Sequence, residues 1–264
     1  MSSELKIQDM GVKKSGHPLK HSFLPSLPMR MLVVAPSNGG KSNLLKNMLL
    51  RPEFGYRDYF TDKKTGALNY FVFSRTLGAD HTLDQLVDQL PKFHAYREWD
   101  DTVIRDIMEY SRTKTDRGVL LLLDDMISDT KAFNKCSGNV LNELAFMGRH
   151  HKVSFIITAQ SYTSIQRPIR INTSAIIAFN LKNKREEQAF LDEQSMWETI
   201  GELYSMATSP KYGFLYLNKD SGQAYLNFER LLSTWGSESE DELLISHTLE
   251  SLSVLGFSRR DSSS

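Results

Sequence analysis

A short stretch of small and polar residues, from position 35 to position 43, has the composition and spacing of a loop that binds nucleotide phosphates. Two glycines come directly before Lys41 and Ser42, as in the Walker A pattern, although alanine stands first, where glycine is more common. In such a loop, backbone N–H groups bind phosphate oxygens, the lysine bridges the β- and γ-phosphates, and the serine hydroxyl ligates Mg²⁺. The alternative is a strand-to-helix turn that is glycine-rich for steric reasons alone. We predict that Ser42 binds Mg²⁺ and that ATP is bound by Ala35, Pro36, Ser37, Asn38, Gly39, Gly40, Lys41, Ser42 and Asn43.

Two adjacent carboxylates, Asp124 and Asp125, end an apolar run that begins at residue 119, which is the Walker B pattern. We predict that Asp124 holds Mg²⁺ through water. We predict that Asp125 is the catalytic base, because the water that attacks the γ-phosphate needs an acceptor close to it. The alternative is that the two acids only mark the point where a strand leaves the core.

Two further side chains could act on the γ-phosphate. Gln160 follows a predicted strand, and we predict that it holds the attacking water or detects the γ-phosphate. Arg149 ends a predicted helix, and we predict that it acts in trans, as an arginine finger on ATP bound to a neighbouring subunit. Each has a simpler alternative, namely an ordinary amide at a strand end and an arginine that complements its helix dipole. With Asp125 and Lys41, these two residues complete the predicted catalytic group.

The elements that must position these residues predict an α/β fold. Short apolar runs alternate with helical patterns, which is typical of a mostly parallel sheet with helices on both faces. A predicted antiparallel hairpin follows, with residues 213–217 and 223–228 on either side of a turn at 220–222. The predicted strands are 29–34, 70–73, 119–123, 153–158 and 175–179, and the predicted helices are 41–50, 100–112, 139–149 and 185–191.

The spacing of the two motifs indicates a particular topology. Between Ser42 and the apolar run at 119 the chain contains the predicted strand at 70–73, so there is room for an extra strand between the two motifs. An extra strand in that place defines the additional-strand branch of P-loop proteins. We therefore expect a RecA-like core of this branch, followed by the C-terminal hairpin.

Composition suggests one domain with short appendages. The chain has 264 residues, of which 40% are hydrophobic and 24% charged. We predict a basic N-terminal arm at 1–28, an ATPase domain at 29–235 and an acidic, serine-rich, flexible tail at 236–264. Lysine plus arginine and aspartate plus glutamate number 32 each, so any DNA contact must be local. The single Cys136 excludes an internal disulfide framework, and no apolar run near the N-terminus predicts a membrane span, which suggests an intracellular protein.

Three segments, in this order, give the sequence a more specific resemblance: 29–42, 121–125 and 148–161. They resemble the poxvirus-type genome-packaging ATPases of the FtsK–HerA superfamily, which occur in large DNA viruses and Polinton-like elements. The resemblance covers roughly residues 28–230. Superfamily members usually have glutamate after the Mg-binding aspartate, but the Asp124–Asp125 form is also met in this branch.

The resemblance implies what the residues alone do not. It implies a homo-oligomeric ring, pentameric or hexameric, that couples ATP hydrolysis to driving double-stranded DNA into a preformed capsid. It also implies capsid or portal-vertex proteins as partners, and a place of action in the infected host cell where virions assemble.

Two other functions remain open from the residues. One is a nucleotide-gated assembly or scaffold factor that recruits capsid or membrane proteins and turns over little ATP. The other is a P-loop kinase, which the lack of an arginine-rich lid segment disfavours. The candidates for DNA contact are basic side chains on the predicted N-terminal arm or after predicted strands, namely Lys13, Lys14, Lys20, Arg167, Arg170, Lys182, Lys184 and Arg185.

Overall fold

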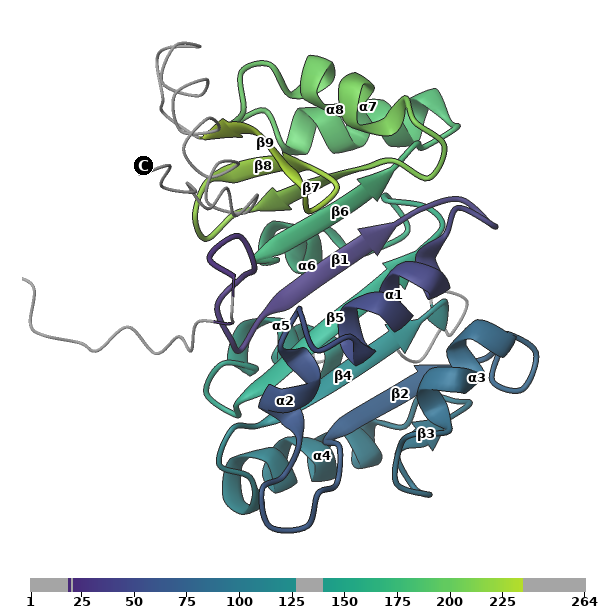
Figure 1. Ribbon diagram of the computed structural model, residues 1–264, viewed down its shortest axis with the longest axis vertical. Helices are drawn as coiled ribbons and strands as arrows, with labels where there is room; N and C mark the ends of the chain where they lie inside the picture. The colour runs from purple at the N-terminus through teal and green to yellow at the C-terminus, as the bar shows by residue number, and fades with distance from the viewer. Residues whose placement is uncertain (1–18, 20, 127–139, 235–264) are drawn as a thin grey trace, which may run out of the picture.

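A mostly parallel β-sheet forms the centre of the protein. The computed structural model describes residues 19, 21–126 and 140–234, and within them nine strands form one sheet in the order β3-β2-β4-β5-β1-β6-β7-β8-β9 (Figure 1). The strands from β3 to β6 in this order are parallel, and β7, β8 and β9 continue the sheet antiparallel. The bounds are β1 Arg30–Val34, β2 Tyr70–Ser74, β3 Ala95–Tyr96, β4 Val119–Asp124, β5 Val153–Ala159, β6 Ala175–Phe179, β7 Phe214–Asn218, β8 Gln223–Leu226 and β9 Arg230–Thr234.

One strand lies between β1, which leads into the predicted phosphate loop, and β4, which ends in the acidic pair. That strand is β5, which pairs in parallel with β1 on one side and with β4 on the other. The predicted additional-strand topology is therefore confirmed. The suggestion that the strand near residues 70–73 is this extra strand is wrong. That strand, β2, pairs with the edge of β4 that faces away from β5 and β1. Strand order depends on long-range pairing, so the order along the chain does not show it.

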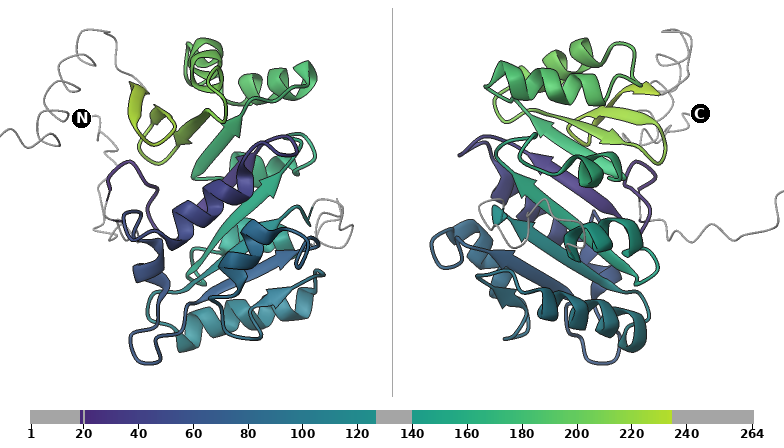
Figure 2. Two further views of the ribbon diagram at one scale, coloured as in Figure 1. Left: turned by 45° about the vertical axis from the view of Figure 1, so that its right-hand side comes forward. Right: turned by 180° about the vertical axis from the view of Figure 1, so that it is seen from behind.

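Helices cover both faces of the sheet, as predicted (Figures 1 and 2). Helices α1, α2 and α3 bury their apolar residues in a core on one face, and α4 to α8 bury theirs in a second core on the other. The bounds are α1 Lys41–Leu50, α2 Tyr56–Phe60, α3 His81–Val87, α4 Asp101–Lys114, α5 Val140–Met147, α6 Arg167–Ile171, α7 Lys184–Glu193 and α8 Ile200–Thr208.

The alternation of side chains along β1 explains how one strand serves two cores. Met31 and Val33 lie in the core beneath α1, whereas Leu32 and Val34 lie in the core beneath α5. Strands β4, β5 and β6 are buried at every position, as expected for strands covered on both faces. This burial makes the central strands a rigid support for the loops that leave their carboxyl ends.

The predicted elements agree with the structure to within two residues at each described end. The phosphate-loop helix and the strand at 175–179 have the predicted bounds, and the predicted hairpin is β7 with β8. Elements that were not predicted are β3, β9, α2, α3, α6 and α8. Most of these are too short to show a hydrophobic period in the sequence.

The first described residues pack onto the domain, although the predicted arm includes them. Leu24 and Leu27 are buried, and the carbonyl oxygen of Phe23 accepts hydrogen bonds from Tyr216 Oη at 2.7 Å and Asn218 Nδ2 at 3.0 Å. Most of the predicted arm, Cys136 and the predicted tail lie outside the described residues. None of the described helices is long and apolar enough to cross a membrane.

Candidate active site

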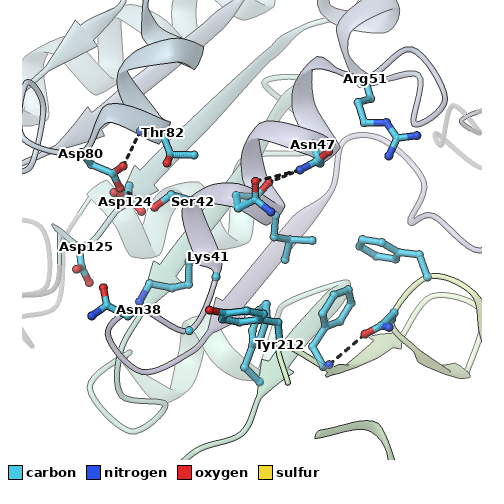
Figure 3. Close-up of a pocket in the computed structure, with 18 of the residues that line it drawn as sticks. Asn38, Lys41, Ser42, Asn47, Arg51, Asp80, Thr82, Asp124, Asp125 and Tyr212 are labelled. Carbon is cyan, nitrogen blue, oxygen red and sulfur yellow. Dashed lines mark hydrogen bonds between the residues drawn. The ribbon is translucent and has the colours of Figure 1, made fainter. Parts of the chain in front are cut away.

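The carboxyl ends of three neighbouring strands bring the predicted motifs into one cleft of about 1210 Å³ (Figure 3). The loop 35–40 follows β1, the acidic pair ends β4, and Gln160 follows β5, which lies between them. The backbone N–H of Ala35 donates to the carbonyl of Ala159 at 3.0 Å, which ties the start of the loop to the end of β5. Of the predicted ATP-binding residues, 37–43 line the cleft.

The loop before α1 has a backbone conformation that depends on small residues. Gly40 has φ 99° and Asn38 has φ 59°, both in the left-handed region that side chains disfavour. A Cβ atom on Gly39 would lie 2.8 Å from the carbonyl oxygen of Pro36. The tight curl therefore requires glycine at 39 and favours it at 40, for the same steric reason that a phosphate-binding loop needs them.

Lys41 lies at the start of α1, in the wall of the cleft. Its Nζ atom donates to the carbonyl oxygens of Ala35 at 2.9 Å and Pro36 at 3.4 Å, so these two residues lie behind the lysine. Burial lowers the pKa of Lys41 below its ordinary value, although the carboxylates of Asp125 and Asp124 act in the opposite direction. A lysine held between carbonyl oxygens and carboxylates can move its ammonium group to a more negative ligand such as a triphosphate.

Asp124 is buried and its orientation is fixed. Its Oδ1 atom accepts a hydrogen bond from Thr158 Oγ1 at 2.7 Å, and its Oδ2 atom accepts one from Ser74 Oγ at 3.1 Å. Burial raises the pKa of Asp124 above its ordinary value, and repulsion by Asp125 adds to the rise, while the two hydroxyl donors oppose it. The hydroxyl groups come from the strands on either side of β4, so the sheet itself aims this carboxylate.

Asp125 and Gln160 form part of a hydrogen-bonded chain that reaches the phosphate loop. Gln160 Nε2 donates to Asp125 Oδ2 at 2.7 Å, and Ser37 Oγ donates to Gln160 Oε1 at 2.7 Å. Asp125 has φ 50° and its backbone N–H donates to Thr158 Oγ1 at 3.1 Å, which turns its side chain out of the strand and toward the cleft. The structure therefore brings both predicted residues together at the mouth of the loop.

Asp80 is a cleft residue that the sequence analysis does not identify. Its Oδ2 atom accepts a hydrogen bond from Ser42 Oγ at 2.6 Å, and its Oδ1 atom caps α3 by accepting from the backbone N–H groups of Thr82 and Leu83. Burial raises the pKa of Asp80, but these hydrogen bonds outweigh it and leave the pKa below its ordinary value. The only local signal is an aspartate before a helix, which indicates a cap and not a site.

Arg149 does not belong to the cleft of its own chain. It lies in the turn between α5 and the start of β5, whereas the cleft lies at the end of β5. The seven residues of β5 separate the two by roughly 20 Å at about 3.3 Å per residue. Arg149 Nη2 lies 3.5 Å from Asp220 Oδ1, in the turn between β7 and β8, and both side chains are partly exposed.

One predicted DNA contact is wrong. Arg170 is only 8% exposed, and its guanidinium group donates to both carboxylate oxygens of Glu193, at 2.9 Å and 2.5 Å, and lies 4.9 Å from the centre of the Tyr162 ring. This arginine holds α6 against α7 and cannot contact DNA. Lys182, Lys184 and Arg185 are exposed and follow the carboxyl end of β6. Their contact with DNA stays a prediction.

The donor set of the cleft suits Mg²⁺. Ser42 and Asp124 offer a hydroxyl and a carboxylate oxygen, which are the hard ligands that Mg²⁺ prefers. Among the residues that the structure describes, no three His, Cys, Asp or Glu side chains gather closely enough to hold an ion by themselves. Such a sparse protein set is typical of Mg²⁺ that binds together with substrate phosphates.

The sheet order, the phosphate loop and the paired acids define an additional-strand P-loop NTPase. Within that class, the family model described as Poxvirus A32 protein matches residues 18–201, and the chain belongs to this family. The resemblance inferred from the three sequence segments is thereby confirmed.

Solved structures agree with this fold. The genome packaging NTPase B204 from Sulfolobus turreted icosahedral virus 2, in complex with AMP, has a TM-score of 0.54 at 16% identity, covering 75% of this chain and 96% of that chain. Its complex with ATP-gammaS has a TM-score of 0.52 at 15% identity over 75% and 96% of the two chains. The DNA-packaging ATPase B204 from Sulfolobus Turreted Icosahedral Virus has a TM-score of 0.53 at 15% identity over 76% and 97%. None of the curated proteins matches the chain.

Proposed function

We propose that the protein hydrolyses ATP with Mg²⁺ and uses the free energy to move double-stranded DNA into a preformed capsid. One observation carries the proposal: the phosphate loop, the buried acid and the hydrogen-bonded base meet in one cleft, on a chain of the Poxvirus A32 protein family. ATP is the expected substrate because the loop and its lysine bind a triphosphate, and hydrolysis follows from the position of the acids.

The residues of the cleft divide the work of binding. Backbone N–H groups of 37–42 surround the phosphates, and the Lys41 ammonium group leaves the carbonyls of 35 and 36 to bridge the β- and γ-oxygens. Ser42 and Asp124 would hold Mg²⁺, and its charge would neutralise the triphosphate. Asp80 accepts a hydrogen bond from the Ser42 hydroxyl, so the lone pairs of that oxygen would be free to bind the ion.

Hydrolysis requires a water molecule in line with the bond to the γ-phosphate. Asp125 accepts a proton from that water, and Gln160 positions it, because the Gln160 amide already bridges Asp125 and the phosphate loop. A γ-phosphate that enters beside Ser37 competes for the same hydrogen bonds. Gln160 would thereby change partners according to whether ATP or ADP is bound.

The position of Arg149 supports a role in trans. Arg149 lies near the amino end of β5, whereas the cleft of its own chain lies at the carboxyl end. It can therefore reach ATP only in another copy of the chain. A ring of identical subunits meets this condition at every interface, and an arginine finger accelerates hydrolysis by roughly 10³–10⁵ in other P-loop enzymes. In the isolated chain the same arginine pairs with Asp220.

A ring needs only a few DNA contacts from each subunit, which is compatible with the neutral net charge. Arg167, Lys182, Lys184 and Arg185 are the described candidates, since all four are exposed. We place the motor in the infected host cell, docked on capsid or portal-vertex proteins.

Measuring ATP hydrolysis with and without long duplex DNA, over a range of salt concentrations, tests the proposal. A motor should be stimulated by DNA, and stimulation should weaken with salt because DNA phosphates hold counterions that binding must release. Lys41→Ala should abolish hydrolysis under all conditions. Hydrolysis that DNA does not change at any salt concentration would instead favour the nucleotide-gated assembly factor.

A further inference from the structure

The cleft extends beyond the phosphate loop onto a wall of aromatic side chains. Tyr212, Phe179, Phe214 and Phe228 line this part, and none of them belongs to a phosphate-binding or acidic motif. In Figure 3, Tyr212 lies on one side of Lys41, and Asp80, Asp124 and Ser42 lie on the other. A Cβ atom on Gly40 would be 3.5 Å from Cδ1 of Tyr212, so the ring borders the first turn of α1.

Tyr212 has a backbone conformation that is uncommon for an aromatic residue. It is 59% exposed, and its φ of 64° lies in the left-handed region, which costs a bulky side chain about 1–2 kcal/mol. The turn that imposes this conformation is tight: Gly213 N donates to the carbonyl of Pro210 at 2.9 Å, and a Cβ on Gly213 would lie 2.4 Å from the carbonyl oxygen of Ala207. A strained, exposed aromatic residue at the edge of a cleft indicates a functional constraint.

The direction of the bound nucleotide places its base on this side. Asp125 and Gln160, which are proposed to act on the γ-phosphate, are hydrogen-bonded to each other next to Asp124. The N–H groups of the loop would hold the phosphates next to Lys41. The α-phosphate, the sugar and the base must then extend away from the acids. Tyr212 lies on that side of the loop (Figure 3).

We infer that the ring of Tyr212 stacks on the nucleobase of the bound nucleoside triphosphate. This inference rests on the proposed function, because it takes the phosphate loop as the triphosphate site. The ammonium group of Lys211 lies 5.1 Å from the centre of the Tyr212 ring. Lys211 is exposed, so a planar base can displace its ammonium group into solvent.

Stacking on an aromatic ring acts on any base, because every base has a π-face. Tyr212 therefore contributes affinity for the nucleoside part of the ligand and little selectivity between adenine and guanine. Loss of the ring should therefore weaken binding of ATP but not of inorganic triphosphate, which has the same phosphate chain and no base.

The experiment compares the dissociation constants of ATP and inorganic tripolyphosphate, both with Mg²⁺, for the unchanged chain and four variants. Tyr212→Ala should weaken ATP binding by roughly 5- to 150-fold, as expected for one lost stacked base, and should leave tripolyphosphate binding within about twofold. Tyr212→Phe, which keeps the ring, should bind both ligands nearly as the unchanged chain does. Phe93→Ala removes an aromatic side chain that is 83% exposed and outside the cleft, and it should change neither constant.

Lys41→Ala separates the failure of this inference from the failure of the proposed function. If Lys41→Ala weakens both ligands and Tyr212→Ala weakens neither, the loop binds phosphates but the base lies elsewhere, and the inference is overturned. Equal weakening of ATP and tripolyphosphate by Tyr212→Ala would overturn it as well, because the ring would then act on the loop. If Lys41→Ala affects neither ligand, the triphosphate site itself is wrong.

Discussion

Replacement of Asp80 by asparagine tests how the structure prepares Ser42 for Mg²⁺. In the unchanged chain the Ser42 hydroxyl donates to Asp80 Oδ2 at 2.6 Å, so its oxygen lone pairs point elsewhere and can bind a cation. Asparagine can keep its oxygen toward Thr82 and Leu83 and still cap α3, because asparagine and aspartate cap helices about equally well. Its NH₂ group would then face Ser42, and that group donates to the lone pairs that the cation needs.

The size of the effect follows from the geometry. A hydrogen bond to a charged acceptor contributes roughly 1.5–3 kcal/mol. Asp80 is only partly buried, so we take the lower end of this range, and about 1.4 kcal/mol corresponds to a tenfold change in an equilibrium constant. We expect Asp80→Asn to raise the Mg²⁺ concentration that half-saturates nucleotide binding by about tenfold, and to leave binding in the presence of a chelator unchanged.

The assay titrates Mg²⁺ at fixed ATP and follows nucleotide binding and hydrolysis separately. Asp100→Asn is the matched control, since Asp100 caps α4 by accepting from the backbone N–H of Thr102 at 2.8 Å and does not line the cleft. It makes the same chemical change at the same position of a helix. If the two variants depend on Mg²⁺ in the same way, the hydrogen bond between Asp80 and Ser42 serves only to hold α3 beside α1, and the reasoning is refuted.

Three further predictions concern catalysis and stability. Asp125→Asn should bind Mg-ATP with nearly unchanged affinity but hydrolyse it at least a hundredfold more slowly, as expected for loss of a catalytic base, and normal turnover would place the base elsewhere. Arg149→Ala should also be nearly inactive. Mixing it with Asp125→Asn subunits should restore part of the hydrolysis rate, because an intact base and an intact finger then meet at shared interfaces. No rescue at any mixing ratio would argue against action in trans. Burial raises the pKa of Glu193, but the hydrogen bonds from Arg170 and Tyr162 outweigh it and leave the pKa below the ordinary 4.5. The ionised pair therefore stabilises the fold fully above pH 4.5 and less as the pH falls below it. Glu193→Gln should lower the free energy of unfolding, measured by urea denaturation, by about 2 kcal/mol at pH 7 and by less at pH 4. An equal loss at both pH values would contradict the pairing.

Local patterns were enough to predict several of the elements around the cleft. The helix at Lys41–Leu50 and the strand at Ala175–Phe179 have the predicted bounds, because hydrophobic period and glycine position act within a few residues. The meeting of Lys41, Asp124 and Gln160 also followed from the sequence. Each comes after an apolar run, and the carboxyl ends of parallel strands share one edge of the sheet.

Long-range pairing decided what the sequence left open. β5, and not the strand near residue 70, separates the two motif strands, because sheet order depends on which edges pair and not on order along the chain. Arg170 is a basic residue of the kind that contacts DNA. In the fold it forms an ion pair with Glu193, which is 23 residues away in the sequence. Asp80 lies 38 residues from Ser42, and Tyr212 comes from the loop after α8. No local pattern relates such residues to the phosphate loop, since only the packing of α3 beside α1 and of β7 beside β6 brings them there.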